Sequence, residues 1–426
     1  MGYIVFLSFV AAIGGILFGY DTAVISGTTE IVKAQFGLST GMEGWFVGCA
    51  LIGSIVGVMV AGMLSDFLGR KKTMLIAALM FSVSAIGCAV CGSFSQLVVY
   101  RMIGGFGIGV VSIVSPVYIS EVAPAEKRGT LVSLYQLFIT IGFLLAYLMN
   151  YLILRGAATD ATGAELGARM FNQEYWRGMF GCEAIPDLLF LVLIFFIPES
   201  PRWLAIRGQR QDKSEEWKAL REPGILKAVL IGSAIAILGQ FMGVNAVLYY
   251  GPKIFQDAGL SGEGSMFSTV LVGVVNMLTT VIALLIIDKV GRKKLVWWGV
   301  GGMIVCLLCI GTWFAVGTLP TWFLLTFFLL YVFCTAISIS AVVFVLLSEM
   351  YPNRVRGLAM SIAGLALWVG TYLIGQLTPW MLENLTPAGT FFLFAFCCLP
   401  YLFIMWKFIP ETTGKTLEEI EAYWKK

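Results

Sequence analysis

The sequence predicts an all-α membrane protein with twelve transmembrane helices in two six-helix bundles, and three observations support this fold class. Of the 426 residues, 59% are apolar and only 12% are charged, whereas a soluble domain carries about 25% charged residues. The apolar residues form long continuous runs, unlike the short alternating segments of a membrane β-barrel. Finally, three motifs recur in the same order in both halves of the chain.

Twelve apolar runs are long enough to cross a bilayer as helices, which takes roughly 20 residues each. They cover residues 4–27, 44–65, 73–93, 98–120, 130–153, 178–197, 225–251, 265–287, 295–317, 321–348, 358–382 and 388–408. The first run has no basic leader, which predicts a retained helix and not a cleaved signal peptide. A short helix is expected in the polar stretch between the sixth and seventh runs, around residues 213–220.

Lys and Arg are distributed unevenly between the loops. If the N-terminus is cytoplasmic, 22 of them fall in the inner loops and tail and five in the outer loops. The excess of positive charge on one side predicts a multi-pass membrane protein with both termini in the cytoplasm. The net charge is only +3, so the partner expected for the chain is the lipid bilayer and not nucleic acid.

The composition also narrows the possible chemistry. The chain has no histidine, which excludes Ser-His and Cys-His nucleophiles and histidine proton shuttles. Cys88/Cys91 and Cys306/Cys309 have the spacing of a metal motif but lie in hydrophobic runs, where a packing role is favoured. We therefore expect no enzyme activity, no cofactor and no metal, and any proton chemistry must use carboxylates.

An internal repeat divides the chain. Asp-x-x-Gly-Arg-Lys follows the second and eighth runs, at an offset of 222 residues. A nine-residue motif that begins with Glu and ends in Arg-Gly follows the fourth and tenth runs, at an offset of 228 residues. Ile-Pro-Glu follows the sixth and twelfth runs, at an offset of 212 residues. The repeat predicts bundles at 1–198 and 225–409, a cytoplasmic linker at 199–224 and a tail at 410–426. Parallel repeats of this kind indicate a substrate site near the bilayer midplane, between the halves, and alternating access by rocking.

Over essentially its whole length the chain resembles the sugar porters of the major facilitator superfamily, and most closely the bacterial proton-coupled xylose symporters. The resemblance is carried by Gly62–Lys72, Arg101–Gly109, Glu121–Gly129, Pro198–Arg202, Gln240–Tyr250, Asp288–Lys293, Pro410–Thr412, Leu17–Gly27 and Tyr175–Phe180. It implies the major facilitator fold and a secondary active transporter of the bacterial inner membrane. Such a protein moves a monosaccharide, a pentose such as xylose or a hexose such as glucose, together with a proton. We expect it to be a monomer.

Charged residues inside a membrane are costly and need a reason. Asp21 in the first run and Arg101 in the fourth fit either a proton-coupling carboxylate controlled by arginine or a fixed salt bridge. The resemblance favours coupling, because proton symporters of this family carry Asp at this position and facilitators commonly carry Asn. Glu183 and Asp187 lie one helical turn apart in the sixth run. Glu183 matches the family, whereas Asp187 stands where a small apolar residue is expected, and its role stays open.

A set of carboxylates and arginines is predicted at the cytoplasmic ends of the helices. These groups form bidentate pairs across neighbouring helices and would make a breakable latch that stabilises the outward-facing state. The alternative is that the basic members are only topology anchors. The candidate latch residues are Asp66, Arg70, Glu121, Arg128, Glu199, Arg202, Asp288, Arg292, Glu349 and Arg356.

Sugars need amides for their hydroxyl groups and an aromatic face for their C–H surface. The amides that match sugar-contacting positions of the family are Gln136, Gln240, Asn245 and Asn276, and the matching aromatic residues are Phe18, Tyr250 and Trp368. Tyr249 and Tyr250 match the outer gate, beside Gly243, which would let the seventh helix bend. For any single amide, a contact that holds helices together is an equally good explanation.

Four positions depart from the family pattern. Gly239 replaces a Gln, Phe143 replaces a further Gln, and Leu367 replaces a polar residue. In the tenth run, which lacks the usual Gly-Pro break, Phe344 replaces a Trp. A less polar pocket leaves two alternatives open beside the proton symporter. One is a passive sugar facilitator, and the other is a porter of the same fold with an altered substrate.

Overall fold

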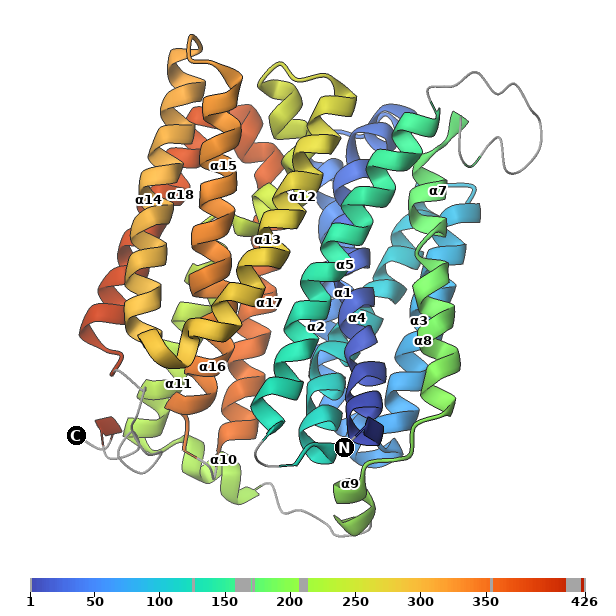
Figure 1. Cartoon of the computed structure of the whole chain (residues 1–426), viewed down its shortest axis with the longest axis vertical. Coiled ribbons are helices and arrows are strands. Elements are labelled where there is room, and N and C mark those ends of the chain that lie inside the picture. The colour runs from blue at the N-terminus through green and yellow to red at the C-terminus, as the bar shows by residue number, and fades with distance from the viewer. Residues whose placement is uncertain are drawn as a thin grey trace. The chain divides into compact units, whose positions relative to one another are not determined.

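The structure is a computed structural model that describes residues 2–124, 127–157, 170, 173–206, 214–352, 355–410 and 423–424. Within these ranges the regular structure is entirely helical (Figure 1). Twelve helical segments are long and apolar enough to cross a membrane. The predicted fold class is confirmed.

The first six spans begin and end close to the predicted runs. They are α1 (Gly2–Phe36), α2 (Thr40–Leu68), α3 (Arg70–Val90), α4 (Phe94–Val122), α5 (Arg128–Ala157) and a sixth span made of α7 (Trp176–Gly181) and α8 (Ala184–Phe195). Several helices extend beyond the apolar run because polar caps stabilise their ends. Ser39 accepts a hydrogen bond from the backbone of Met42 at 3.4 Å, and Ser93 accepts one from Gln96 at 3.3 Å.

Two short helices precede the last six spans. They are α9 (Pro201–Ile206) and α10 (Ser214–Leu220), the latter close to the short helix predicted from the sequence. The spans that follow are α11 (Pro223–Gln240) with α12 (Val244–Asp257), α13 (Gly262–Val290), α14 (Arg292–Val316), α15 (Thr321–Thr335) with the π-helix η3 (Ala336–Ser340) and α16 (Ala341–Met350), α17 (Arg356–Asn384) and α18 (Thr386–Lys407).

Two of these spans are interrupted. Gly243 lies between α11 and α12 with a positive φ of 90°, a conformation that favours glycine, and this is the bend that the sequence predicts. The tenth span lacks proline, yet the π-helix Ala336–Ser340 interrupts it. The widened turn shows that a break in this helix does not need the Gly-Pro pair of the family.

The chain forms two compact units. The first contains Met1–Gly208 and Val247–Met277, and the second contains Gln209–Ala246 and Leu278–Lys426. The outer part of the seventh span and the first half of α13 therefore belong with the N-terminal helices. The bundle limits proposed from the repeat, 1–198 and 225–409, remain predictions.

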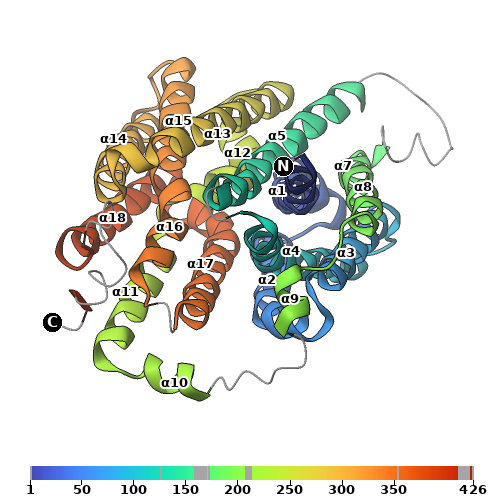
Figure 2. The same ribbon diagram turned by 60° about the horizontal axis from the view of Figure 1, so that its bottom comes forward.

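Glycines bring helix backbones into close contact in the first unit. A Cβ on Gly19 of α1 would overlap the carbonyl oxygen of Ile139 on α5, and one on Gly105 of α4 would overlap the backbone of Ala50 on α2. The α1–α5 and α2–α4 pairs lie side by side in Figure 2. Small residues at these contacts are typical of membrane helices, which pack by shape because the hydrophobic effect gives them little attraction.

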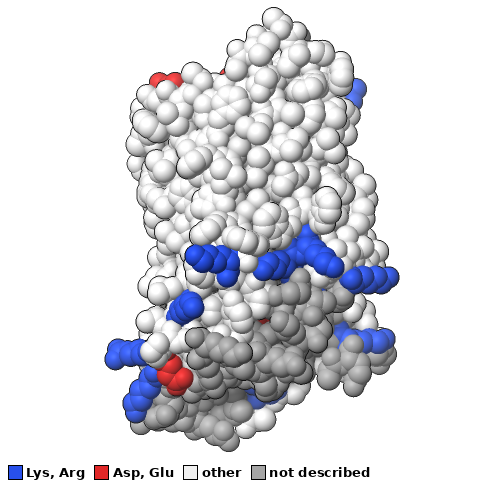
Figure 3. All heavy atoms as spheres, turned by 90° about the vertical axis from the view of Figure 1, so that its left-hand side faces the viewer, with Lys and Arg blue, Asp and Glu red and all other residues white. Residues whose placement is uncertain are grey.

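Charged side chains are rare over most of the face in Figure 3. Its Lys and Arg residues gather toward the lower end of the view. A one-sided accumulation of positive charge agrees with the expected cytoplasmic end, although the orientation in the membrane remains a prediction.

Candidate functional site

The structure brings together the two charged residues that the sequence singles out inside the membrane. Arg101 on α4 and Asp21 on α1 form an ion pair through Nη1 and Oδ1, and their side chains are 2% and 1% exposed. Arg101 Nη1 also donates to the backbone oxygen of Asp21 at 3.2 Å. The guanidinium lies over the ring of Phe180, with Cζ 5.4 Å from the ring centroid.

This pair is incompletely hydrogen-bonded. Within the described chain, Asp21 Oδ2 and Arg101 Nε are buried without a hydrogen-bond partner. Gly104, one turn after Arg101, makes room for the carboxylate, because a Cβ there would lie 2.8 Å from Asp21 Oδ2. The fold therefore buries a charge pair and leaves part of its hydrogen-bonding capacity unused.

Two more acids are buried in the sixth span. Glu183 precedes α8 and Asp187 lies in its first turn, and both are buried. Glu183 Oε1 and both carboxylate oxygens of Asp187 have no hydrogen-bond partner among the described residues. Arg177 does not neutralise them, because its guanidinium binds Glu174 at 2.6 Å and the carbonyl oxygen of Cys91 at 2.6 Å.

The predicted latch residues of the first unit meet at the start of α3. Arg70 donates from Nε and Nη2 to the two carboxylate oxygens of Glu121, at 3.0 and 3.1 Å, and from Nη1 to Asp66 at 3.3 Å. Glu199 accepts from the backbone N–H groups of Arg70 and Lys71 at 2.8 and 3.1 Å. Its carboxylate thus caps the N-terminus of α3, where the helix dipole favours a negative charge.

Two neighbours of this cluster were not predicted. Ser200 Oγ donates to Glu121 Oε2 at 2.5 Å, and the indole N–H of Trp203 donates to the backbone oxygen of Asp66 at 2.8 Å. Ser200 follows Glu199 directly in the sequence, and Trp203 lies four residues after it. A polar residue beside a predicted latch carboxylate is the signal that would have indicated Ser200.

The second unit repeats part of this arrangement among its described residues. Arg292 Nη2 donates to Glu349 at 2.9 Å, and Nη1 donates to the carbonyl oxygen of Ile287 at 3.3 Å. Gly291 before Arg292 has a φ of 97°, as Gly69 has before Arg70, so the two helix starts share one backbone conformation. Glu349 is 25% exposed, against 4% for Glu121.

The other latch candidates are less closely engaged. Arg356 donates to the carbonyl oxygen of Tyr351 at 3.3 and 3.4 Å, and Arg202 is exposed and takes part in none of these ion pairs. The side chains of Arg128 and Asp288 lie outside the part of the chain that the structure describes.

Five sugar-site or gate candidates belong to the first unit. Phe18, Gln136 and Asn276 are half-buried, and Tyr249 and Tyr250 are buried. Tyr250 departs from helical geometry, with φ −115° and ψ 15°, two residues before Pro252. Since proline cannot donate a backbone hydrogen bond and its ring clashes with the preceding turn, α12 bends at the position of the predicted outer gate.

Three candidates belong to the second unit, and two of them touch. Asn245 Nδ2 donates to Gln240 Oε1 at 2.6 Å, and Thr371 Oγ1 donates to the same oxygen at 3.2 Å. Trp368 is buried one turn before Thr371 on α17. Thr371 was not predicted, although its spacing of three residues from Trp368 would have placed it on the same helix face.

The structure describes the surroundings of three of the four positions that depart from the family pattern. The nearest atoms to a Cβ on Gly239 would be Ile339 Cγ2 at 3.6 Å and Tyr401 Cε2 at 3.8 Å, so a side chain can begin there without a clash. Phe143 is buried against Tyr147, with ring centroids 6.1 Å apart. Leu367 is half-buried on α17. The side chain of Phe344 lies outside the described residues.

A second charged cluster joins α1, α2 and α12, and it was not predicted. Glu43 is 0% exposed and accepts from Lys33 at 2.6 Å and from Lys253 at 2.7 Å. Lys253 also lies 3.5 Å from Glu30. Next to this cluster, Tyr147 donates to the carbonyl oxygen of Leu248 at 2.9 Å. These contacts fix α12 to the first unit.

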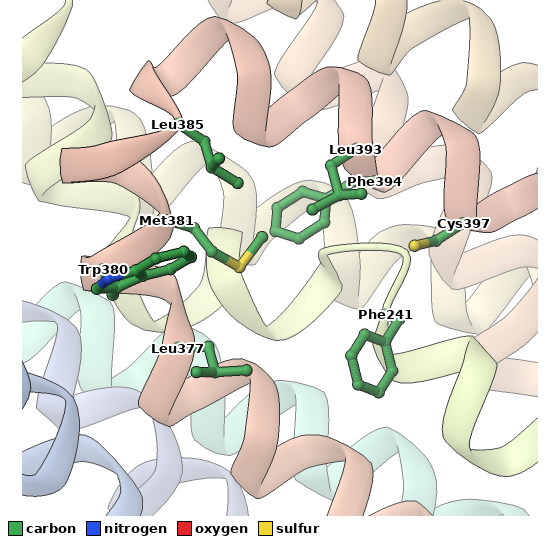
Figure 4. Close-up of a pocket in the computed structure, with 8 residues that line it drawn as sticks. All are labelled: Phe241, Leu377, Trp380, Met381, Leu385, Leu393, Phe394 and Cys397. Carbon is green, nitrogen blue, oxygen red and sulfur yellow. The ribbon is translucent and has the colours of Figure 1, made fainter.

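One pocket in the second unit does not suit a sugar. Its cavity of about 190 Å³ lies between the break after α11 and helices α17 and α18 (Figure 4). The lining residues are Phe241, Leu377, Trp380, Met381, Leu385, Leu393, Phe394 and Cys397. Such a lining offers almost no partners for sugar hydroxyls.

The cysteines fit a packing role. Cys88 and Cys91 are buried and free. A buried thiol is a poor thiolate ligand.

Three comparisons with known proteins agree with one another. The family model described as "Sugar (and other) transporter" matches residues 7–223 and 209–424. The chain is 38% identical over 455 residues to the arabinose-proton symporter of Bacillus subtilis (strain 168), with 100% of this chain and 96% of that protein covered. It is 36% identical over 481 residues to the D-xylose-proton symporter of Escherichia coli (strain K12), with 99% and 96% covered. The partially occluded inward open structure of the xylose transporter XylE from E. coli superposes with a TM-score of 0.84 at 36% identity, with 98% and 100% covered.

Proposed function

The chain belongs to the sugar porter family of the major facilitator superfamily, and from this premise we propose that it is a proton-coupled monosaccharide symporter that works by alternating access. The arabinose and xylose symporters among its relatives favour a pentose as the substrate. We place it in a bacterial inner membrane with both termini cytoplasmic, as a monomer and without enzyme activity.

The Asp21–Arg101 pair carries the proposal for proton coupling. An ionised carboxylate at this depth depends on its counter-charge. When Asp21 takes a proton, its negative charge disappears, and with it the electrostatic attraction that holds the Arg101 guanidinium beside the carboxyl group. Protonation therefore changes the contacts between α1 and α4, which is the event that a coupled carrier needs.

A comparison with the latch supports a switching role for this pair. Arg70 and Glu121 are joined by two hydrogen bonds, and Ser200 adds a third to the carboxylate. Asp21 and Arg101 each have a buried polar atom without a hydrogen-bond partner among the residues that the structure describes. A pair with unused hydrogen-bonding capacity has less to lose on separation than a fully satisfied one, so the Asp21–Arg101 pair separates more readily than the Arg70–Glu121 pair when Asp21 is protonated.

Sugar recognition is assigned to the amide and aromatic candidates. Gln240, Asn245 and Thr371 form a polar cluster inside membrane-spanning helices, where polar groups are costly unless they serve a cavity or each other. We propose that sugar hydroxyls exchange with these mutual hydrogen bonds. The other proposed contacts are Phe18, Gln136, Tyr250, Asn276 and Trp368, with Tyr249 and Tyr250 as the outer gate.

The inner clusters are proposed to stabilise the outward-facing state. Each joins the start of one helix to the end of another within its own unit. Glu199 adds the segment after the sixth span to the first of them. The linker therefore begins at a fixed point, and a movement of the linker would act directly on α3.

Transport by purified protein in lipid vesicles tests the function. The wild type should accumulate labelled D-xylose or L-arabinose against a gradient when the outside is acidic. Asp21→Asn should lose accumulation and keep counterflow, in which labelled sugar exchanges for unlabelled sugar. Glu263→Gln removes an exposed carboxylate and is the matched control.

Each alternative function has its own result. Equilibration of sugar without accumulation by the wild type would show a facilitator. Accumulation by Asp21→Asn would remove the coupling role from that residue. Binding of another solute, with no pentose or hexose bound, would show an altered substrate.

A further inference from the structure

Asp187 has no part in the function proposed so far, and its surroundings do not explain it as a structural residue. It is 0% exposed, and neither carboxylate oxygen has a hydrogen-bond partner among the described residues. A buried polar group that stabilises a fold is normally satisfied. An unsatisfied carboxyl group in a membrane helix needs another reason.

Asp187 lies close enough to Asp21 of the proposed coupling pair for the two carboxyl groups to interact electrostatically. The helix α1 and the sixth span run in opposite directions, because Tyr20 donates to the carbonyl oxygen of Met179 on α7 at 3.3 Å while a Cβ on Gly14 would lie 3.3 Å from the ring of Phe190 on α8. Asp187 stands between these two contacts, one turn before Phe190. It therefore lies between the level of Asp21 and the Phe195 end of α8.

Positive charge is scarce around it. The groups whose charges act on Glu183 or Asp187 are Tyr20 and Asp21 on α1, Cys88 on α3 and Arg101 on α4, and the two acids also act on each other. Arg101 is the one cation among these groups of the described chain, and it is already paired with Asp21. A proton is the smallest species that removes the uncompensated charge of a buried carboxylate.

We propose that Asp187 is a second proton-binding carboxyl group of the transport cycle, which holds the transported proton between Asp21 and the Phe195 end of α8. The O–H bond formed at Asp187 replaces the one broken at Asp21 or Glu183, and the proton leaves when Asp187 ionises again. The inference rests on the proposed symport, which supplies the proton.

The test compares the wild type with Asp187→Asn in vesicles, with D-xylose as the probe and a range of external pH values. We expect Asp187→Asn to lose proton-driven accumulation down to the level measured without a pH gradient, while counterflow is retained. Asp187→Glu should restore accumulation, and Glu263→Gln should behave as the wild type. Accumulation by Asp187→Asn with the pH profile of the wild type would overturn the proposal.

A second measurement covers the case in which Asp187→Asn does not fold. Asp187→Glu keeps the acid and moves it by one methylene, so the pH profile of accumulation should shift while counterflow stays constant. An unchanged profile overturns the proposal. Absence of proton-driven accumulation in the wild type, or accumulation driven by a sodium gradient instead, refutes the proposed symport and this inference with it.

Discussion

Replacing Glu121 by Gln should destabilise the first unit more than any comparable change at the repeated site in the second unit. Glu121 accepts two hydrogen bonds from Arg70 and one from Ser200, and its side chain is 4% exposed. Removing one charge of a buried pair costs about 3–5 kcal/mol, because the other charge is left uncompensated. Asp66 remains 3.3 Å from Arg70, so we expect a loss near the lower limit, about 3 kcal/mol.

The matched variant is Glu349→Gln. Glu349 accepts a bond at 2.9 Å from Arg292 and is 25% exposed, so water already screens part of its charge. The loss of one charge-assisted hydrogen bond is worth about 1.5 kcal/mol here, the lower end of its usual range. For a unit of this size the two losses correspond to decreases in Tm of about 6–12 °C and about 3–6 °C.

Thermal unfolding of the purified proteins, followed by a dye that reacts with the buried cysteines as they become exposed, measures both changes. The variants share the same chemical substitution at equivalent positions of the repeat, so effects of detergent and lipid cancel in the comparison. Equal decreases in Tm, or a larger one for Glu349→Gln, would contradict the assignment of the stronger joint to the first unit.

Two further substitutions test the packing and the charged cluster on α12. Gly105→Ala should cost about 1–3 kcal/mol by overpacking against the backbone of α2, whereas Gly301→Ala, with no atom within 4 Å of its Cβ, should be neutral or stabilising. A comparison of Tm and of monodisperse yield decides this, and equal yields would show that α2 and α4 can separate. Lys253→Met leaves the buried Glu43 with one lysine fewer and should cost about 1.5–3 kcal/mol. Lys253→Met should also speed hydrogen exchange in α12. The control Lys227→Met, which removes an exposed lysine from α11, should leave this exchange unchanged. Unchanged exchange in α12 of Lys253→Met as well would refute the role of the cluster.

The sequence predicted the features that depend on local composition. The twelve spans were predictable because an apolar run of sufficient length is itself the physical requirement for crossing a bilayer. The contact between Arg70 and Glu121 was also predictable, because an arginine and a carboxylate at adjacent helix ends form strong charge-assisted hydrogen bonds. The bend at Gly243 was predictable because glycine readily adopts the positive φ that such a bend requires.

Features that depend on tertiary geometry were not predictable. Glu43 and Lys253 are 210 residues apart, and nothing local to either indicates that α12 packs beside α2. The cap that Glu199 provides for α3 depends on where the chain leaves the sixth span. The π-helix at Ala336–Ser340 has no proline to indicate it, because an extra residue accommodated within a helix leaves no compositional signal.

The pairing of α1 with α5 has a consequence for biogenesis. The helix α1 packs against α5, which ends about 120 residues later, and at ordinary rates of synthesis this means a delay on the order of ten seconds. During that time α1 already carries Asp21, and the arginine that neutralises it has yet to emerge with α4. The nascent first helix must therefore be sheltered by the insertion machinery or hold its carboxyl group as the neutral acid, so the residue proposed to couple transport also sets a condition on how the protein is made.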